Sequence, residues 1–270
     1  MPDAVICGYA RTPFGKFRGA LSSYSAVELG IKAVEELLSR TGIDPSLGVI
    51  DQVYMGQVLQ AGAGQAPARQ VALGCGMPNS TPCTTINKVC GSSLKAVMIA
   101  ATEIRAGISE LAVAGGMESM SNAPRFIRDA RRGEDVPFKS LLSILSHDGL
   151  TDAYSGELMG NTGETCALEY GISREQSDAY SIRSHKLSAE GWENGEIGKE
   201  CVSMEELSID EGIRMDADMS TLISLKPVFS EDGQVTAGNA SQVSDGASAV
   251  LIDSEETANR MGLPILARIV

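Results

Sequence analysis

The sequence predicts an α/β fold in which βαβ units lie on a mainly parallel, mixed sheet. Up to about residue 117, short β-branched or apolar runs alternate with segments of helical apolar spacing. This alternation is typical of a parallel sheet covered by helices. Glycine is frequent, with 29 residues, and aromatic residues make up only 4% of the chain. Frequent glycine favours the tight turns and close backbone packing of such a fold.

The first part of the chain gives its elements in a clear order. Ser25 and Glu28 form a capping box, so a helix is expected to begin there and to end at Gly42. The run at 84–89 predicts a buried strand. The other strands are expected at residues 3–10, 53–58 and 111–114, and the other helices at 66–73 and 91–105. One face of the helix at 91–105 is expected to carry Leu94, Val97, Met98, Ala101 and Ile104.

The middle of the chain differs in pattern. Residues 119–150 are irregular, and helices are expected near 157–170 and 174–194, the second beginning at the capping box Ser173 and Gln176. A strand at 247–253 and a helix at 254–261 then return to the first pattern. The expected organisation is therefore an α/β domain of residues 1–117 plus 245–270, interrupted by an inserted, mostly helical loop domain of residues 118–244.

Charge and composition exclude several functions. The net charge of -13 argues against nucleic-acid binding and against attraction to anionic membranes. No apolar run approaches a membrane span, and the first residues lack a signal peptide, so a cytoplasmic location is expected. The six cysteines form no C-x-x-C pair and only two histidines are present, so no metal site is expected.

Cys90 is the candidate nucleophile. It follows a predicted strand and precedes a predicted helix, and Gly91 permits the turn between them. A thiol at a helix N-terminus faces the positive end of the helix dipole and unpaired N–H groups, which favour a thiolate and can stabilise an oxyanion. This setting suits acyl transfer. By itself, it is also compatible with a small, buried structural cysteine.

Eight stretches along the chain resemble the thiolase family. The residues Asn87-Lys88-Val89-Cys90-Gly91-Ser92 closely resemble the segment that carries the thiolase nucleophile, although Ser93 stands where thiolases usually have glycine. The other seven stretches occur in the family's order and begin at Arg11, Gly64, Gly115, Asp148, Met159, Lys226 and Gly233.

The resemblance implies an acetyl-CoA acetyltransferase type of enzyme. Such an enzyme makes or cleaves a 3-ketoacyl-CoA through an acyl-Cys90 intermediate, and coenzyme A thioesters are its substrates rather than a permanently bound cofactor. The inserted domain resembles the family's CoA-binding lobe, in which the positions matching pantetheine contacts are Leu150, Met159, Ala237 and Ser241.

Three family motifs of the C-terminal half do not occur in this sequence: Gly-His-Pro, Cys-x-Gly-Gly and Asn-Glu-x-Phe. The resemblance therefore implies that the C-terminal half of the duplicated fold is absent. The expected partner is a C-terminal thiolase half or further copies of the chain, with no nucleic acid and no membrane. Three alternatives stay open: a piece of a longer enzyme, one subunit of a split thiolase, or a non-catalytic CoA or acyl-CoA binding module.

Overall fold

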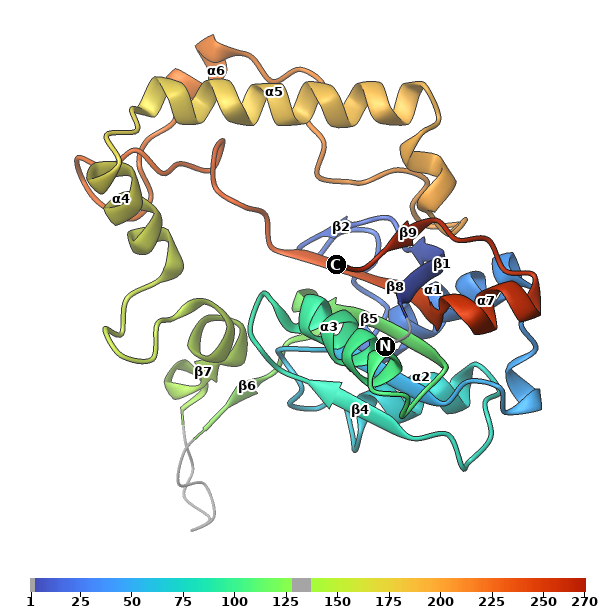
Figure 1. Ribbon diagram of the computed structural model, residues 1–270. Coiled ribbons are helices and arrows are strands. Elements are labelled where there is room, and N and C mark those ends of the chain that lie inside the picture. The colour runs from blue at the N-terminus through green and yellow to red at the C-terminus, as the bar shows by residue number, and fades with distance from the viewer. Residues whose placement is uncertain (1–2, 128–136) are drawn as a thin grey trace. The chain divides into compact units, whose positions relative to one another are not determined.

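The computed structural model describes residues 3–127 and 137–270 (Figure 1). The chain divides into two compact units. Unit 1 consists of residues 1–124, 200–211 and 244–270, and unit 2 of residues 125–199 and 212–243. The chain thus leaves unit 1 twice and returns to it twice.

Unit 1 is built on a mixed sheet, as the sequence predicts. Its described residues form a seven-stranded sheet in which the order is β4-β3-β5-β8-β1-β9 and β2 pairs with β8. The strands are β1 (Ala4–Arg11), β2 (Gly15–Lys16), β3 (Gln52–Gly56), β4 (Cys83–Ile86), β5 (Leu111–Ser119), β8 (Ser244–Ser254) and β9 (Ala267–Arg268). Strand β3 is parallel to both β4 and β5, whereas β8 is antiparallel to both β5 and β1. The four strands β1, β3, β4 and β5 therefore run in one direction, and β8 lies between two of them in the opposite direction.

Helices cover both faces of this sheet. The helices of unit 1 are α1 (Ala26–Thr41), α2 (Pro67–Gly74), α3 (Ser92–Arg105), α7 (Glu255–Met261) and the short η1 (Pro45–Leu47) and η2 (Met120–Asn122). Buried residues of α1, α2 and α7 form one apolar core with the sheet, and those of α3 form a second core on its opposite face. Unit 1 therefore has three layers, helix–sheet–helix, with α3 alone among the long helices on its side (Figure 1).

Helix α1 begins and ends where the sequence indicates. The Ser25 hydroxyl accepts a hydrogen bond from the Glu28 N–H, and the Glu28 carboxylate accepts one from the Ser25 N–H, which completes the predicted capping box. Gly42 ends the helix in the left-handed conformation, with φ 69°. The predicted helix boundaries are confirmed here because the signals for both ends are local.

Two expectations about the α3 side of the sheet hold only in part. The segment expected as a buried strand, 84–89, contributes only to the short edge strand β4, and its residues are partly exposed. Leu94 and Met98, expected on one face of α3, are 70% and 54% exposed. Ala101 and Ile104 are buried as expected, Val97 packs against the same core, and the small residues Ala96 and Ala100 complete the buried face.

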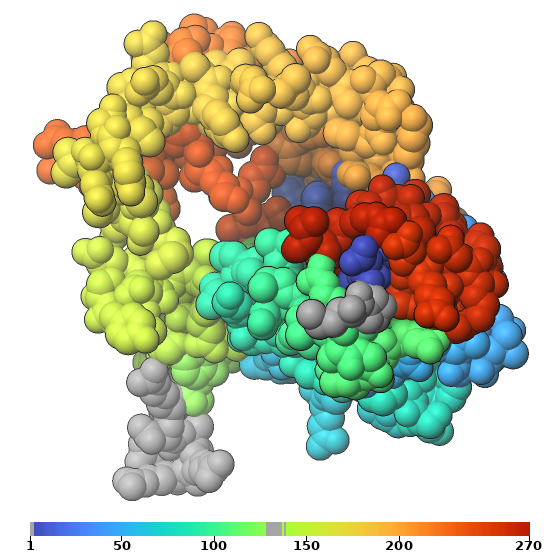
Figure 2. Space-filling view, in the orientation of Figure 1, coloured from blue at the N-terminus to red at the C-terminus, as the bar shows by residue number. Residues whose placement is uncertain are grey.

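The sheet approaches α3 closely, which explains the second error. A Cβ atom on Gly56 of β3 would lie 2.6 Å from the backbone of Ser92 and Ser93, and one on Gly116 of β5 would lie 2.7 Å from the Ser93 Cβ. Only small side chains fit between helix and sheet near Ser92 and Ser93, and Leu94 and Met98 face outward, whereas Ile104 is buried further along the helix. Figure 2 shows the atoms of α3 on the visible surface of unit 1.

Unit 2 is mostly helical. Its principal helices are α4 (Met159–Glu169), α5 (Arg174–Glu193) and α6 (Met219–Ile223). The predicted capping box of Ser173 and Gln176 begins α5 and is confirmed. The region expected to be irregular contains a short antiparallel pair, β6 (Arg125–Phe126) and β7 (Leu142–Ser143), the 3₁₀ turn η4 (Phe138–Ser140) and the π-helical segment η5 (Leu145–Leu150). A further turn, η6 (Ile197–Glu200), leads back to unit 1. In the described part of the chain, no helix is both long and apolar enough to cross a membrane.

Asp253 predicts a pH-dependent stability for unit 1. This β8 residue is fully buried, and neither carboxyl oxygen has a hydrogen-bond partner among the described residues. Burial raises the pKa of Asp253 to about 7 from a usual value of 3.8. The folded state thus prefers the neutral carboxylic acid of Asp253. Unit 1 is therefore most stable below about pH 4, and this stability is lost as the pH rises through about 7.

We expect Asp253→Asn to remove this pH dependence. At pH 8 the variant should be more stable by up to about 4 kcal/mol, because it avoids an unpaired buried carboxylate. Urea unfolding of both proteins between pH 4 and 8 measures the difference. If the free energy of unfolding of the two proteins changed with pH in the same way, the raised pKa of Asp253 would be contradicted.

Candidate active site

Cys90 lies in the short connection between β4 and α3. Its side chain is exposed, and α3 begins two residues later at Ser92. The N–H groups of the first helical turn have no partner within a helix, so the helix presents hydrogen-bond donors and a partial positive charge at this end. The thiol is therefore accessible in a setting that suits a nucleophile.

The residue before Cys90 has an unusual backbone. Val89 has φ 47°, in the left-handed region that β-branched residues rarely adopt. Its N–H donates to the Asn87 Oδ1 atom at 3.0 Å. Its carbonyl accepts from the Ser92 hydroxyl at 2.5 Å, and the same hydroxyl accepts from the Lys88 N–H at 2.9 Å. Side chains on either side of Cys90 thus fix this turn.

A neighbouring loop supports the turn. The Asn87 Nδ2 group donates to the Val58 carbonyl at 3.3 Å. The Val58 N–H in turn donates to the Glu118 carboxylate at 2.8 Å, and the Leu59 N–H donates to it at 3.4 Å. Burial raises the pKa of Glu118, and these two hydrogen bonds oppose that shift. Glu118 therefore ties the end of β5 to the loop that contacts Asn87.

The other cysteines are less suited to attack a substrate. Burial raises the pKa of Cys7 to about 11 and that of Cys75 to about 12. The pKa of Cys201 is raised to about 11, and that of Cys83 is also raised, mainly because both thiols are desolvated. Cys166 is exposed, but it lies within α4 and not at its N-terminus.

In unit 2, the four predicted pantetheine contacts lie on two segments. An isolated antiparallel bridge between Thr151 and Leu158 brings the flanking residues Leu150 and Met159 near each other. Ala237 and Ser241 are both exposed and lie at a turn, in which the Ala240 N–H donates to the Thr236 carbonyl at 2.9 Å. The Glu164 carboxylate of α4 accepts from the N–H groups of Gln234 and Val235 at 2.8 Å each, and so connects the two segments.

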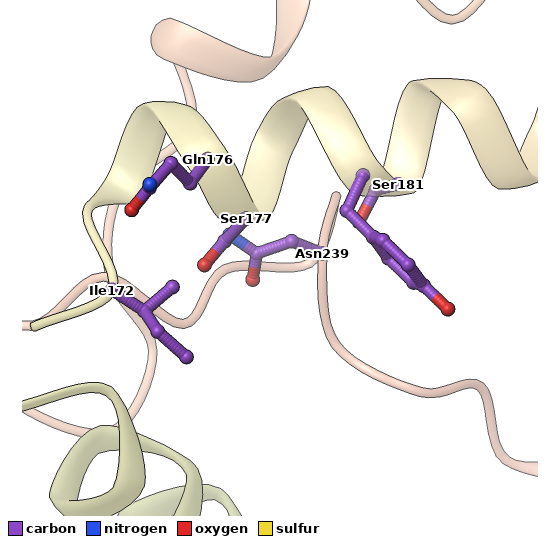
Figure 3. Close-up of a pocket in the computed structure, with 6 residues that line it drawn as sticks. Ile172, Gln176, Ser177, Ser181 and Asn239 are labelled. Atoms are coloured by element: carbon purple, nitrogen blue, oxygen red, sulfur yellow. The ribbon is translucent and has the colours of Figure 1, made fainter. Parts of the chain in front are cut away.

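Asn239 holds this turn against α5. Its Nδ2 group donates to the Asp178 carboxylate and to the Gln234 carbonyl, each at 2.9 Å, and its Oδ1 atom accepts from the Thr236 N–H at 2.8 Å. Figure 3 shows Asn239 extending toward α5, at an open hollow that is also lined by Ile172, Gln176, Ser177, Tyr180 and Ser181.

Asp178 joins Asn239 to α5. It is fully buried, and its second oxygen accepts from the Arg174 Nε atom at 2.7 Å. Arg174 also donates to the carbonyls of Leu222 and Leu225. The buried pair therefore links α5, the 236–241 turn and the segment that follows α6.

Comparison with known proteins decides the family. The family model described as thiolase, N-terminal domain, matches residues 4–256. The chain belongs to the thiolase family. It is 46% identical over 277 residues to a probable acetyl-CoA acetyltransferase of Escherichia coli (strain K12), covering 100% of this chain and 70% of that protein. It is also 46% identical over 278 residues to acetyl-CoA acetyltransferase 2 of Arabidopsis thaliana, covering 99% of this chain and 68% of that protein.

Solved thiolase structures have the same fold. The crystal structure of Acat5 thiolase from Ascaris suum in complex with coenzyme A has a TM-score of 0.92 and 36% identity, covering 99% of this chain and 70% of that chain. Human mitochondrial 3-ketoacyl-CoA thiolase in complex with CoA has a TM-score of 0.94 and 35% identity, covering 100% of this chain and 69% of that chain. The α/β fold expected from the sequence is thus confirmed as a thiolase fold.

Several residues that hold the turns of this thiolase chain's candidate site were not predicted from the sequence. Asn87, Ser92, Glu118 and Asn239 all lie in stretches that resemble the family, but their hydrogen bonds depend on backbone geometry. Asp178 follows a capping box and reads as an ordinary polar helix residue. Its only sequence signal is Arg174, four residues earlier on the same helix face.

Proposed function

We propose that this chain transfers acyl groups between CoA thioesters through an acyl-Cys90 intermediate. The Cys90 thiol gives up its proton and its sulfur forms a bond to the thioester carbonyl carbon. The bond from that carbon to the CoA sulfur breaks, and CoA leaves as a thiolate that takes up a proton. The observation that carries the proposal is the exposed Cys90 thiol on a fixed turn at the N-terminus of α3. Membership of the thiolase family supports it.

We also propose that unit 2 binds the CoA part of the substrate. The apolar side chains of Leu150 and Met159 suit the pantetheine arm, and Ala237 and Ser241 are exposed at a turn held by Asn239 and Glu164. The Ascaris and human thiolases are described in complex with CoA, which supports CoA as the ligand.

The complete reaction is a thiolase-type Claisen condensation or its reverse, thiolytic cleavage. Two acetyl-CoA molecules would give acetoacetyl-CoA and CoA. Forming the carbon–carbon bond also requires a base that removes a proton from the second acetyl group. Both histidines of this sequence lie in unit 2, where His147 pairs with Asp148 and His185 accepts from the Arg214 N–H. We propose that a C-terminal thiolase half supplies this base.

Exchange of labelled CoA into acetyl-CoA tests the acyl-transfer step alone. This half-reaction needs Cys90 and a CoA site, but forms no carbon–carbon bond. Incorporation of label into acetyl-CoA is the expected result, with the chain alone or with an added C-terminal thiolase half. Binding of CoA without exchange in either case would favour the non-catalytic CoA-binding module instead.

A further inference from the structure

The turn that carries Cys90 depends on a strained residue. A left-handed conformation at a β-branched residue is costly and persists only when its surroundings impose it. Val89 is in that conformation and is 49% exposed, so packing around its side chain is incomplete. The restraint must therefore come mainly from hydrogen bonds to its backbone.

Besides the backbone N–H of Ser92, which donates to the Val89 carbonyl at 3.1 Å, two side chains supply hydrogen bonds to the Val89 backbone. Asn87 accepts from the Val89 N–H, and Ser92 donates to the Val89 carbonyl. Ser92 is 5% exposed and packs closely against Gly56 of β3, so little space is left for its side chain to move. Asn87 is itself held by the Val58 carbonyl, in the loop whose N–H groups donate to Glu118.

We propose that Ser92 and Asn87 are positioning residues for the nucleophile: they hold Val89 in the left-handed conformation that places the Cys90 thiol at the N-terminus of α3. Neither residue is assigned a contact with substrate. Their role in acyl transfer rests on the proposed function, but their effect on the exposure and reactivity of the thiol does not.

The test measures alkylation of Cys90 by iodoacetamide in the full chain, followed by peptide mass mapping that separates Cys90 from the other five cysteines. Ser92→Ala is expected to slow alkylation at Cys90 about tenfold, since Val89 then escapes the left-handed conformation. Adding Val89→Gly should restore the rate to within about threefold of the original, because glycine adopts positive φ without strain.

A matched control removes a similar bond elsewhere on the same helix. The Thr102 hydroxyl donates to the Met98 carbonyl at 2.7 Å, in the last part of α3. Thr102→Ala should leave the alkylation rate at Cys90 unchanged. Asn87→Ala is the second test variant, and its loss of rate should also be restored by Val89→Gly.

Two results would overturn the proposal. One is an unchanged alkylation rate in folded Ser92→Ala. The other is slow alkylation of Cys90 in Ser92→Ala that stays slow when Val89→Gly is added. That result would mean that Ser92 does not act through Val89. If circular dichroism shows that Ser92→Ala does not fold, the alkylation rates of Asn87→Ala with and without Val89→Gly test the proposal instead. Failure of the original chain to exchange CoA would count against the acyl-transfer function but would leave the alkylation comparison intact.

Discussion

Cys90→Ser is expected to lower the rate of acyl exchange between CoA and acetyl-CoA by at least about 10⁴-fold. A serine hydroxyl is a much weaker nucleophile than a thiol, and no base is assigned to activate it. The replacement changes a single atom, so the turn at Val89 and the residues proposed to bind CoA should remain as they are.

The matched control for this variant is Cys166→Ser. Cys166 is the other exposed cysteine, and it lies on α4, away from that helix's N-terminus. Its replacement should change exchange by less than about twofold, because substitution at an exposed site away from the chemistry has little effect. Equal loss of exchange in both variants would contradict the assignment of Cys90 as the nucleophile.

Asp178→Ala should have the largest effect on unit 2. The replacement leaves the partly buried Arg174 without its ion-pair partner and removes the acceptor for Asn239. Breaking a buried pair by removing one partner costs about 3–5 kcal/mol. We therefore expect a decrease of about 3 kcal/mol in the free energy of unfolding of unit 2 and, if the proposed CoA site includes the 236–241 turn, weaker CoA binding.

Hydrogen exchange in α5, read alongside chemical denaturation, measures this change for unit 2 itself. Glu190→Ala, an exposed position on the same helix, serves as the control and should stay within about 0.5 kcal/mol of the original. A loss below about 1 kcal/mol in Asp178→Ala would show that the buried pair does not hold the turn.

Features fixed by neighbouring residues could be predicted from the sequence. The capping boxes of Ser25 with Glu28 and of Ser173 with Gln176 need only residues three apart, and both are present. The candidate nucleophile Cys90 was also recognised locally, from a strand, a turn and a helix with a family-like segment between them.

Features that depend on distant residues could not be predicted in the same way. The outward turn of Leu94 and Met98 follows from the close approach of Gly56 and Gly116, and the periodicity of α3 gives no sign of it. The contact between Asp178 and Asn239 joins residues 61 positions apart. The left-handed Val89 is a backbone property that valine itself disfavours, so the roles of Asn87 and Ser92 become visible only with the turn in place.

The central claim is that Cys90 accepts the acyl group, and mass spectrometry after incubation with acetyl-CoA tests it most directly. The account predicts the mass of one acetyl group on the peptide that contains Cys90, its removal by added CoA, and its absence in Cys90→Ser. Acetylation of another cysteine in place of Cys90, or no acetylation even with a C-terminal thiolase half supplied, would contradict the account.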